Sequence, residues 1–176
     1  MTALAWVLWC GLAVSLPAEP TREYQVKAVF LFNFAQFVNW PAGAFADPQA
    51  PLIIGVLGDD PFDTVLDEAV RDEKIGARPL LIQRYQRVED IGICHILFIS
   101  RSETGRLEQI VARLQNRSIL TVGDTDGFSR RGVMIRFLSE NNKIRLRINL
   151  DATKAASLML SSKLLRPAEI VTTGRD

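Results

Sequence analysis

The run Leu52–Leu57, with the sequence LIIGVL, lies between Pro51 and Gly58 and contains no polar side chain. An uninterrupted apolar run of this length that ends at a glycine is typical of a strand buried on both faces of a parallel sheet. The run Ile93–Ile99, with the sequence ICHILFI, has the same character. We therefore expect both runs to lie inside one sheet that helices cover on both sides.

The segments around these two runs alternate between extended and helical patterns. Further strands are expected at Arg78–Arg84 and Ile119–Val122, and helices at about Pro61–Glu73 and Glu103–Gln115. Asp60 and Ser102 are the expected N-cap residues, because their side-chain oxygens can accept hydrogen bonds from the first N–H groups of each helix. This alternation predicts the α/β class, a three-layer sandwich with a largely parallel central sheet.

The pattern changes after Gly132, where two extended runs flank Asn141-Asn142. Asparagine tolerates the positive φ angles of a two-residue turn, so Val133–Glu140 and Lys143–Leu150 are expected to form an antiparallel hairpin. A last helix, Ala152–Leu165 with Asp151 as its cap, is expected to close the domain before Pro167.

The register of this hairpin follows from pairing Glu140 with Lys143. One face then carries apolar residues, and the other places Arg136 directly opposite Arg147 with Arg145 beside them. Like charges across a strand pair are destabilising unless solvent, a carboxylate or a partner answers them. Arg136, Arg145 and Arg147 are therefore candidate partner-binding residues, with local pairing to Asp or Glu as the alternative.

Aromatic residues are concentrated in the segment Arg22–Trp40, which lacks glycine and proline and is long enough for about five helical turns. At 100° per residue, Phe30, Phe34 and Phe37 share one face of the expected helix. That face either packs in the core or contacts a second subunit or a partner, because exposed apolar patches are often interaction sites. Phe34 and Phe37 are the candidate residues for such a contact, including a homodimer.

The composition limits the classes of function. The chain has 176 residues, 48% of them hydrophobic, which is enough for one sizeable core. Its net charge is +1, so no global field favours nucleic acid. One histidine and two cysteines are too few for a structural zinc or a di-histidine metal site, and no nucleophile or phosphate-binding motif is present. We expect a non-enzymatic protein without catalytic residues, metal ligands or cofactors.

The N-terminal segment has the pattern of an export signal. Ala3–Leu16 is an uncharged run of 14 residues, whereas a bilayer-spanning helix needs about 20. Leu16-Pro17-Ala18 follows, and the small Ala18 fits a cleavage site. We expect residues 1–18 to be a signal peptide and residues 19–176 to form a single domain. Cys94 would then be the only thiol, and its apolar neighbours predict that it is buried and inert.

Three acidic residues indicate a different possibility. Asp59 and Asp60 follow the Leu52–Leu57 strand, and Asp124 follows the expected strand at Ile119–Val122. Carboxyl ends of parallel strands meet at one edge of a sheet, where ligands commonly bind. Asp59, Asp60 and Asp124 are therefore the candidate residues of an alternative function, a small-ligand or sensory module coupled to a sensor kinase or a transporter.

Several stretches, in order along the chain, resemble the YfiR-like family. They are YQVKAVFLFNFAQFVNWP at residues 24–41, the run from Ile53 to Phe62, CHILFI at residues 94–99, and the ending from Asn141 to Leu165. The resemblance implies a periplasmic protein that binds the sensor region of an inner-membrane diguanylate cyclase and represses it. Lower cyclic di-GMP output would then limit biofilm formation and alter motility.

The same resemblance implies that an OmpA-like outer-membrane lipoprotein can sequester the protein and release the cyclase. Better-known members of the family contain disulfides and respond to the redox state of the periplasm. Once residues 1–18 are removed, Cys94 is the only cysteine left in this chain. An intramolecular disulfide switch is therefore not expected here.

Overall fold

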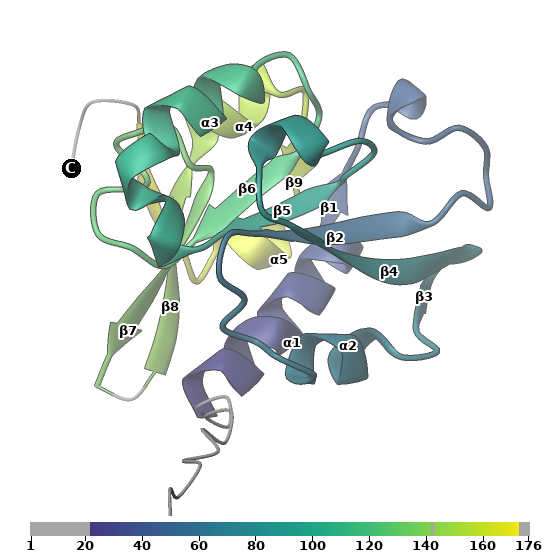
Figure 1. Ribbon diagram of the computed structural model, residues 1–176, viewed down its shortest axis with the longest axis horizontal. Coiled ribbons are helices and arrows are strands. Elements are labelled where there is room, and N and C mark those ends of the chain that lie inside the picture. Colours follow the sequence, from purple (N-terminus) through teal and green to yellow (C-terminus); the bar gives the residue numbers. More distant parts are fainter. Residues whose placement is uncertain (1–21, 142, 173–176) are drawn as a thin grey trace, which may run out of the picture.

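The computed structural model describes residues 22–141 and 143–172 (Figure 1). The large sheet contains β2 (Leu52–Leu57), β3 (Lys74–Ile75), β4 (Arg78–Tyr85), β5 (Ile96–Ile99), β6 (Leu120–Gly123), β7 (Ile135–Glu140), β8 (Lys143–Asn149) and β10 (Glu169–Val171). Their order across the sheet is β10-β8-β7-β6-β5-β2-β4-β3. Only the β7–β8 and β3–β4 pairs are antiparallel, and the other neighbours run parallel. The expected α/β class with a largely parallel sheet is confirmed.

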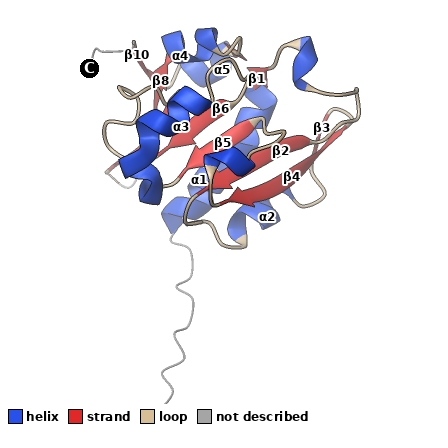
Figure 2. Cartoon of the chain, turned by 45° about the horizontal axis from the view of Figure 1, so that its top comes forward, coloured by secondary structure: helices blue, strands red, loops and turns tan. Residues whose placement is uncertain are grey.

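Helices lie on both faces of this sheet (Figure 2). They are α1 (Arg22–Phe37), α2 (Val65–Val70), α3 (Leu107–Arg113), α4 (Leu150–Ala155) and α5 (Ser162–Leu165). Residues of α1, α2 and α5 share one core cluster with alternate residues of the central strands, such as Ile96 and Phe98. Leu97 and Ile99 alternate with these two residues along β5, and they pack with α3 in a second cluster. β5 is therefore buried on both faces, as its sequence predicts.

The predicted hairpin is confirmed in its register. Arg136 pairs with Arg147, Phe137 with Leu146 and Glu140 with Lys143. Asn141 has a φ of 50°, which is the left-handed conformation expected at the turn.

The first helix ends earlier than expected. α1 stops at Phe37 instead of Trp40, because Val38–Asn39 forms β1 and pairs antiparallel with β9 (Met159–Leu160). The amide of Ser161 also donates to the carbonyl of Phe37. A partner strand far along the chain therefore competes with the last helical turn.

The expected helix Pro61–Glu73 is reduced to α2. Asp60 does not cap it, because its Oδ1 accepts from the amide of Phe62 and forms a local turn. Asp63 then adopts a φ of 50°, which is incompatible with a continuous right-handed helix. The prediction was wrong in both the length and the cap of this helix.

The helix expected at Glu103–Gln115 begins as a 3₁₀ helix, η3 (Arg101–Arg106), and continues as α3. Ser102 was the wrong cap: its Oγ accepts from the amide of Asp59, in the loop after β2. Its hydroxyl joins η3 to the loop after β2 at the carboxyl edge of the sheet instead of capping the helix.

The expected closing helix Ala152–Leu165 is divided into α4, β9 and α5. Asn149 caps α4, because its Oδ1 accepts from the amide of Ala152, so Asp151 was the wrong cap. Ser157, with a φ of 58°, breaks the chain after α4. The strand β10, which was not predicted, follows Pro167 and pairs with β8.

Candidate functional site

The charged face of the β7–β8 hairpin contains the three arginines selected from the sequence. Arg136 forms an ion pair with Asp126, and its side chain is only 12% exposed. An Arg147 guanidinium nitrogen donates to Glu169 Oε2 at 3.0 Å. β10 therefore supplies a carboxylate that the sequence prediction did not contain. Arg136 and Arg147 therefore each have a carboxylate partner of their own, and these two partners offset the repulsion between the arginines.

Arg145 differs from the other two arginines. Its side chain is 67% exposed, and its only ion-pair contact within the described residues is Glu140, with Nε and Oε2 3.8 Å apart. Exposed pairs at such a distance contribute little to stability. Of the three candidate arginines, Arg145 is therefore the most available to a partner.

Beside this hairpin, the N-terminal end of α1 and the hairpin tip enclose a hollow of about 590 Å³. Arg22, Lys143 and Ile144 are among its lining residues. Lys143 lies two residues before Arg145 on β8, so both side chains belong to the same face of that strand. The basic face therefore continues from Arg145 to the tip of the hairpin.

The two selected phenylalanines of α1 lie in different environments. Phe34 is fully buried and stacks on Phe137 of β7, with ring centroids 5.9 Å apart. It forms core and presents no surface to a partner in this structure. Phe37 is partly buried, and Lys163 Nζ lies 5.9 Å from its ring centre. The exposed apolar residues of this helix are instead Val26 and Val29.

The three aspartates of the alternative site do lie in loops that follow parallel strands. Asp60 is held by Arg84, whose Nε is 2.6 Å from Asp60 Oδ2, and Arg84 also binds Asp67. The hydrogen bonds that Arg84 donates to Asp67 and Asp60 raise the pKa of its guanidinium. Asp59 is exposed. One carboxylate of the predicted set is thus already engaged by the protein's own cation.

Asp124 is also paired within the protein, by residues of α1 that were not predicted as site residues from the sequence. Lys27 of α1 is 2% exposed, and its Nζ lies 2.6 Å from Asp124 Oδ2 and 2.5 Å from Glu23 Oε1. The Tyr24 hydroxyl also donates to Asp124, at 2.9 Å. Burial, followed by the charge of Asp124, raises the pKa of Tyr24, and the Lys27 hydrogen bond lowers the pKa of Glu23. This cluster fixes the start of α1 to the carboxyl edge of the sheet.

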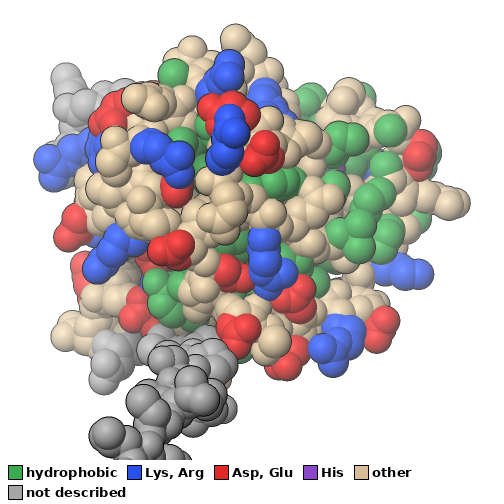
Figure 3. All heavy atoms as spheres, in the orientation of Figure 1, with side chains coloured by type: hydrophobic (Ala, Val, Ile, Leu, Met, Phe, Trp, Pro, Cys, Tyr) green, Lys and Arg blue, Asp and Glu red, His purple; other side chains and the backbone are tan. Residues whose placement is uncertain are grey.

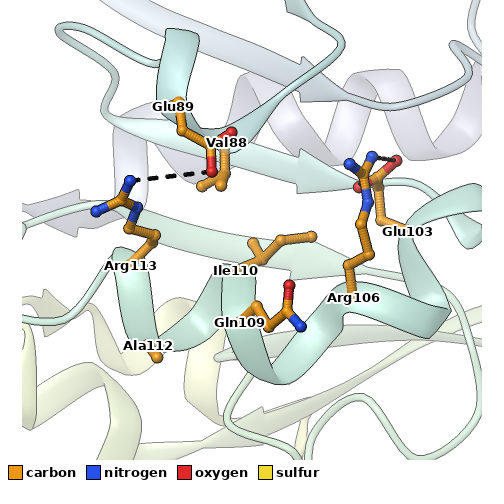
Figure 4. A pocket seen from close by; sticks show the side chains of 8 residues that line it. All are labelled: Val88, Glu89, Glu103, Arg106, Gln109, Ile110, Ala112 and Arg113. Carbon is orange, nitrogen blue, oxygen red and sulfur yellow. Dashed lines mark hydrogen bonds and ion pairs between the residues drawn. The ribbon is translucent and has the colours of Figure 1, made fainter.

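A separate hollow of about 400 Å³ lies beside α3 and the 3₁₀ helix η2 (Val88–Asp90), as Figure 4 shows. Arg106 binds the buried Glu103 carboxylate at 2.7 Å, and Arg113 lies 4.0 Å from Glu89. The charges around this hollow are balanced in pairs. Positive and negative side chains are likewise interspersed over the face in Figure 3.

Cys94 lies two residues before β5 and is buried. Its thiol donates to the carbonyl of Ile96, and burial raises its pKa to about 12. A thiol with such a pKa is almost entirely protonated near neutral pH and is a poor nucleophile. This environment supports the predicted inert thiol.

Within residues 22–141 and 143–172, no group of three or more His, Cys, Asp or Glu side chains is arranged to hold a metal ion. No helix in this part of the chain is both long and apolar enough to cross a membrane. The expected signal peptide, residues 1–18, lies outside the described residues.

The structure is an α/β domain in which Asp60 and Asp124 are paired with Arg84 and Lys27, whereas Arg145 on the hairpin is largely exposed. The family model for YfiR/HmsC-like proteins matches residues 24–169, and the chain belongs to this family. No curated protein matches the chain at a significant level. The family is regulatory and non-catalytic, and it acts in the context of cyclic di-GMP.

Proposed function

We propose that this chain is a periplasmic regulator that binds the sensor region of an inner-membrane diguanylate cyclase and holds the enzyme inactive. The family match over residues 24–169 is the observation that carries this proposal. Repression would lower cyclic di-GMP and with it biofilm formation. The regulator itself performs no chemistry on the nucleotide.

The basic hairpin face is the proposed contact surface. Arg136 and Arg147 are paired with Asp126 and Glu169, and their side chains are only 12% and 21% exposed, so their charges are largely offset within the protein. Arg145 extends from this surface into solvent. Such an arrangement fits an acidic patch on the partner, and charge complementarity of this kind raises the association rate and fixes orientation.

The partner-facing role of Arg145 has a matched control elsewhere on the chain. Arg113 on α3 is 66% exposed and lies 4.0 Å from Glu89, which closely resembles the situation of Arg145. Arg145→Glu and Arg113→Glu therefore make the same change of charge at equal exposure. Only the first lies on the proposed contact surface.

The experiment begins with capture of inner-membrane proteins by the regulator and identification of a diguanylate cyclase by mass spectrometry. Association with the purified sensor region is then measured at low and at physiological salt, together with cyclase activity. Arg145→Glu should lower the association rate by about 3- to 10-fold at low salt, while Arg113→Glu should change it by less than about twofold. Equal effects of both substitutions would exclude the hairpin face. Full cyclase activity in the presence of saturating wild-type protein would exclude repression.

An OmpA-like outer-membrane lipoprotein is the proposed second partner, which would compete with the cyclase for the regulator.

Homodimer formation is proposed through the apolar side of α1, with Phe37 at its margin. Sedimentation of the wild-type protein and of Val29→Asp tests this, because Val29 is 51% exposed and its replacement leaves the core intact. A sedimentation coefficient that is the same for both proteins would rule out this dimer.

Export is proposed from the uncharged run that precedes Ala18. Cleavage after Ala18 would give a mature chain that begins at Glu19. Mass spectrometry of protein recovered from the periplasm measures this directly. Recovery of protein that retains residues 1–18 would contradict the cleavage.

A further inference from the structure

His95 is the only histidine of the chain, and both of its ring nitrogens have backbone partners. The amide of Ile53 donates to Nδ1 at 3.0 Å. Nε2 lies 3.1 Å from the carbonyl oxygen of Ala44. An amide can only donate and a carbonyl can only accept, so the ring is held as the neutral tautomer with its proton on Nε2.

The ring thereby connects the sheet to the segment Pro41–Pro51, which we name the 41–51 loop. This loop contains the 3₁₀ helix η1 (Ala42–Ala44) and joins β1 to β2. The backbone of His95 belongs to the sheet, since its amide donates to Ile53 and its carbonyl accepts from Leu120. The side chain reaches back to Ile53 and outward to Ala44. Hydrophobic side chains gather where this loop lies (Figures 1 and 3).

Aromatic and cationic groups form a layered contact on the loop. The rings of His95 and Phe45 stack with centroids 4.3 Å apart and 11° between their planes. The Arg78 guanidinium lies 3.8 Å from the centre of the Phe45 ring. Arg78 also donates to the carbonyls of Asp47 and Ala50, at 2.6 and 3.0 Å. His95 and Arg78 therefore hold the loop at separate points.

A second proton on the ring is incompatible with this arrangement. It would add an N–H at Nδ1 that points at the N–H of Ile53, so one hydrogen bond is replaced by a repulsion. Rotating the ring by half a turn would break the bond to Ala44 as well. Burial lowers the pKa of His95, and the charge of Arg78 lowers it further, while the bond to Ala44 raises it.

Charged groups around the ring do not offset this cost. Asp47, the acidic residue of the loop, is exposed and accepts from the amide of Gln49. Arg117, from the segment before β6, donates to the carbonyls of Ile91 and Gly92. The neighbouring Cys94 is a buried thiol, and β2 has no titratable side chain. Across the described part of the chain, no carboxylate forms a hydrogen bond or ion pair with the His95 ring.

We propose that His95 is an acid-sensitive latch, whose protonation releases residues 42–45 of the 41–51 loop from the sheet, while Arg78 still holds Asp47 and Ala50 and the rest of the domain remains folded. The open state gives the imidazolium access to water, which screens it from the charge of Arg78. Because the latch requires no partner, it goes beyond the proposed function and holds whether or not a cyclase is bound. Its effect is to change the apolar surface of the loop with pH.

The direction of the pH dependence follows from linkage. The pKa of His95 is lowered in the closed state, so the open state binds more protons below the ordinary histidine value of about 6.5. The closed state is fully favoured above that pH and loses stability as the pH falls through the lowered value. Between the two values, the ratio of open to closed molecules should rise by up to about tenfold per pH unit.

The test uses nuclear magnetic resonance on the ¹⁵N-labelled protein between pH 8 and pH 4.5. At pH 8, the single imidazole should show its proton on Nε2. With acid, the amides of residues 42–45 should change along the same curve as His95, with a midpoint below 6.5, while the amides of β7, which do not contact His95, remain constant. A proton on Nδ1 at pH 8, or loop amides that do not follow the His95 titration, would overturn the proposal.

Two variants separate the latch from general acid effects. His95→Phe keeps a ring against Phe45 but cannot titrate, so the loop amides should no longer respond to pH. Phe45→Leu keeps both hydrogen bonds but weakens the stack, so the midpoint should move toward 6.5. Far-UV circular dichroism should stay constant over the same range. Loss of all structure in one transition with acid, or an unchanged pH response in His95→Phe, would exclude a local latch.

Discussion

The two faces of the β7–β8 hairpin are built from alternating residues of the same strands, yet they have different roles. On one face, Ile135, Phe137, Leu146 and Ile148 are at most 3% exposed and belong to the main core. On the other, Arg136 and Arg147 are opposite one another and are answered by Asp126 and Glu169. The apolar face therefore fixes the fold and the register, whereas the charged face is free to vary in its contacts with little effect on stability.

The strongest test of this contrast is a charge on the apolar face. Ile148→Asp would place an unpaired carboxylate at a site with no exposure to solvent. Its cost, on the order of 5 kcal/mol, is comparable to the whole stability of many domains, so the variant should lose its cooperative fold. Thermal unfolding followed by circular dichroism measures this.

Ile144→Asp is the matched control for this variant. Ile144 lies on the same face of β8 but nearer the hairpin tip, and it is only partly buried. Its carboxylate can reach water, so we expect a folded protein with a modest loss of stability. Equal destabilisation of both variants would contradict the view that burial sets the role of this face.

The next largest effect is expected at Phe137, which stacks on Phe34 and contacts Phe30. Phe137→Ala removes a fully packed ring between α1 and the hairpin, and the free energy of unfolding should fall by about 3 to 5 kcal/mol. Urea denaturation at neutral pH measures the change. Phe137→Leu should recover a substantial part of it, because most of the cavity is refilled. A loss below about 1 kcal/mol for the alanine variant would show that the hairpin is not anchored through this ring.

A smaller effect is expected on the charged face. Arg136→Gln removes the ion pair with Asp126, whose side chain is 92% exposed. Such a pair is screened by water, so the free energy of unfolding should fall by about 1 kcal/mol or less. Arg136→Gln should also relieve the repulsion of Arg147 across the strand pair. Chemical denaturation at two salt concentrations measures both contributions, and a loss above about 3 kcal/mol would place this face in the core instead.

The contrast between the two faces also explains why the hairpin was predictable. A period of two in the apolar residues, together with Asn141-Asn142 between the runs, determines both the face and the register. The same local reasoning located β2, β4, β5 and β6, whose apolar runs need no knowledge of their partners.

Other parts of the fold depend on contacts that the local sequence does not contain. The expected closing helix contains no glycine or proline that would predict its break, and the break comes with the pairing of β9 with the distant β1. The helical spacing predicts that Phe34 and Phe37 share one face of α1, but it does not predict which of the two the sheet covers. No local pattern in the sequence indicates that Lys27 is a buried ion-pair residue, because its partner Asp124 lies 97 residues away.

The smallest predicted effect compares two of the three ion pairs of the charged face, those of Arg147 and Arg145. Arg147 and Glu169 are 3.0 Å apart and join β8 to β10, while Arg145 and Glu140 are 3.8 Å apart with both side chains largely exposed. A double-mutant cycle with alanine at each position should give a coupling of up to about 1 kcal/mol for the first pair and below about 0.3 kcal/mol for the second. A coupling that small leaves the Arg145 guanidinium able to exchange Glu140 for a carboxylate of a partner at almost no cost. A stronger coupling for Arg145 than for Arg147 would reverse this order. Arg147 would then be the arginine that more readily exchanges its own carboxylate for one of a partner.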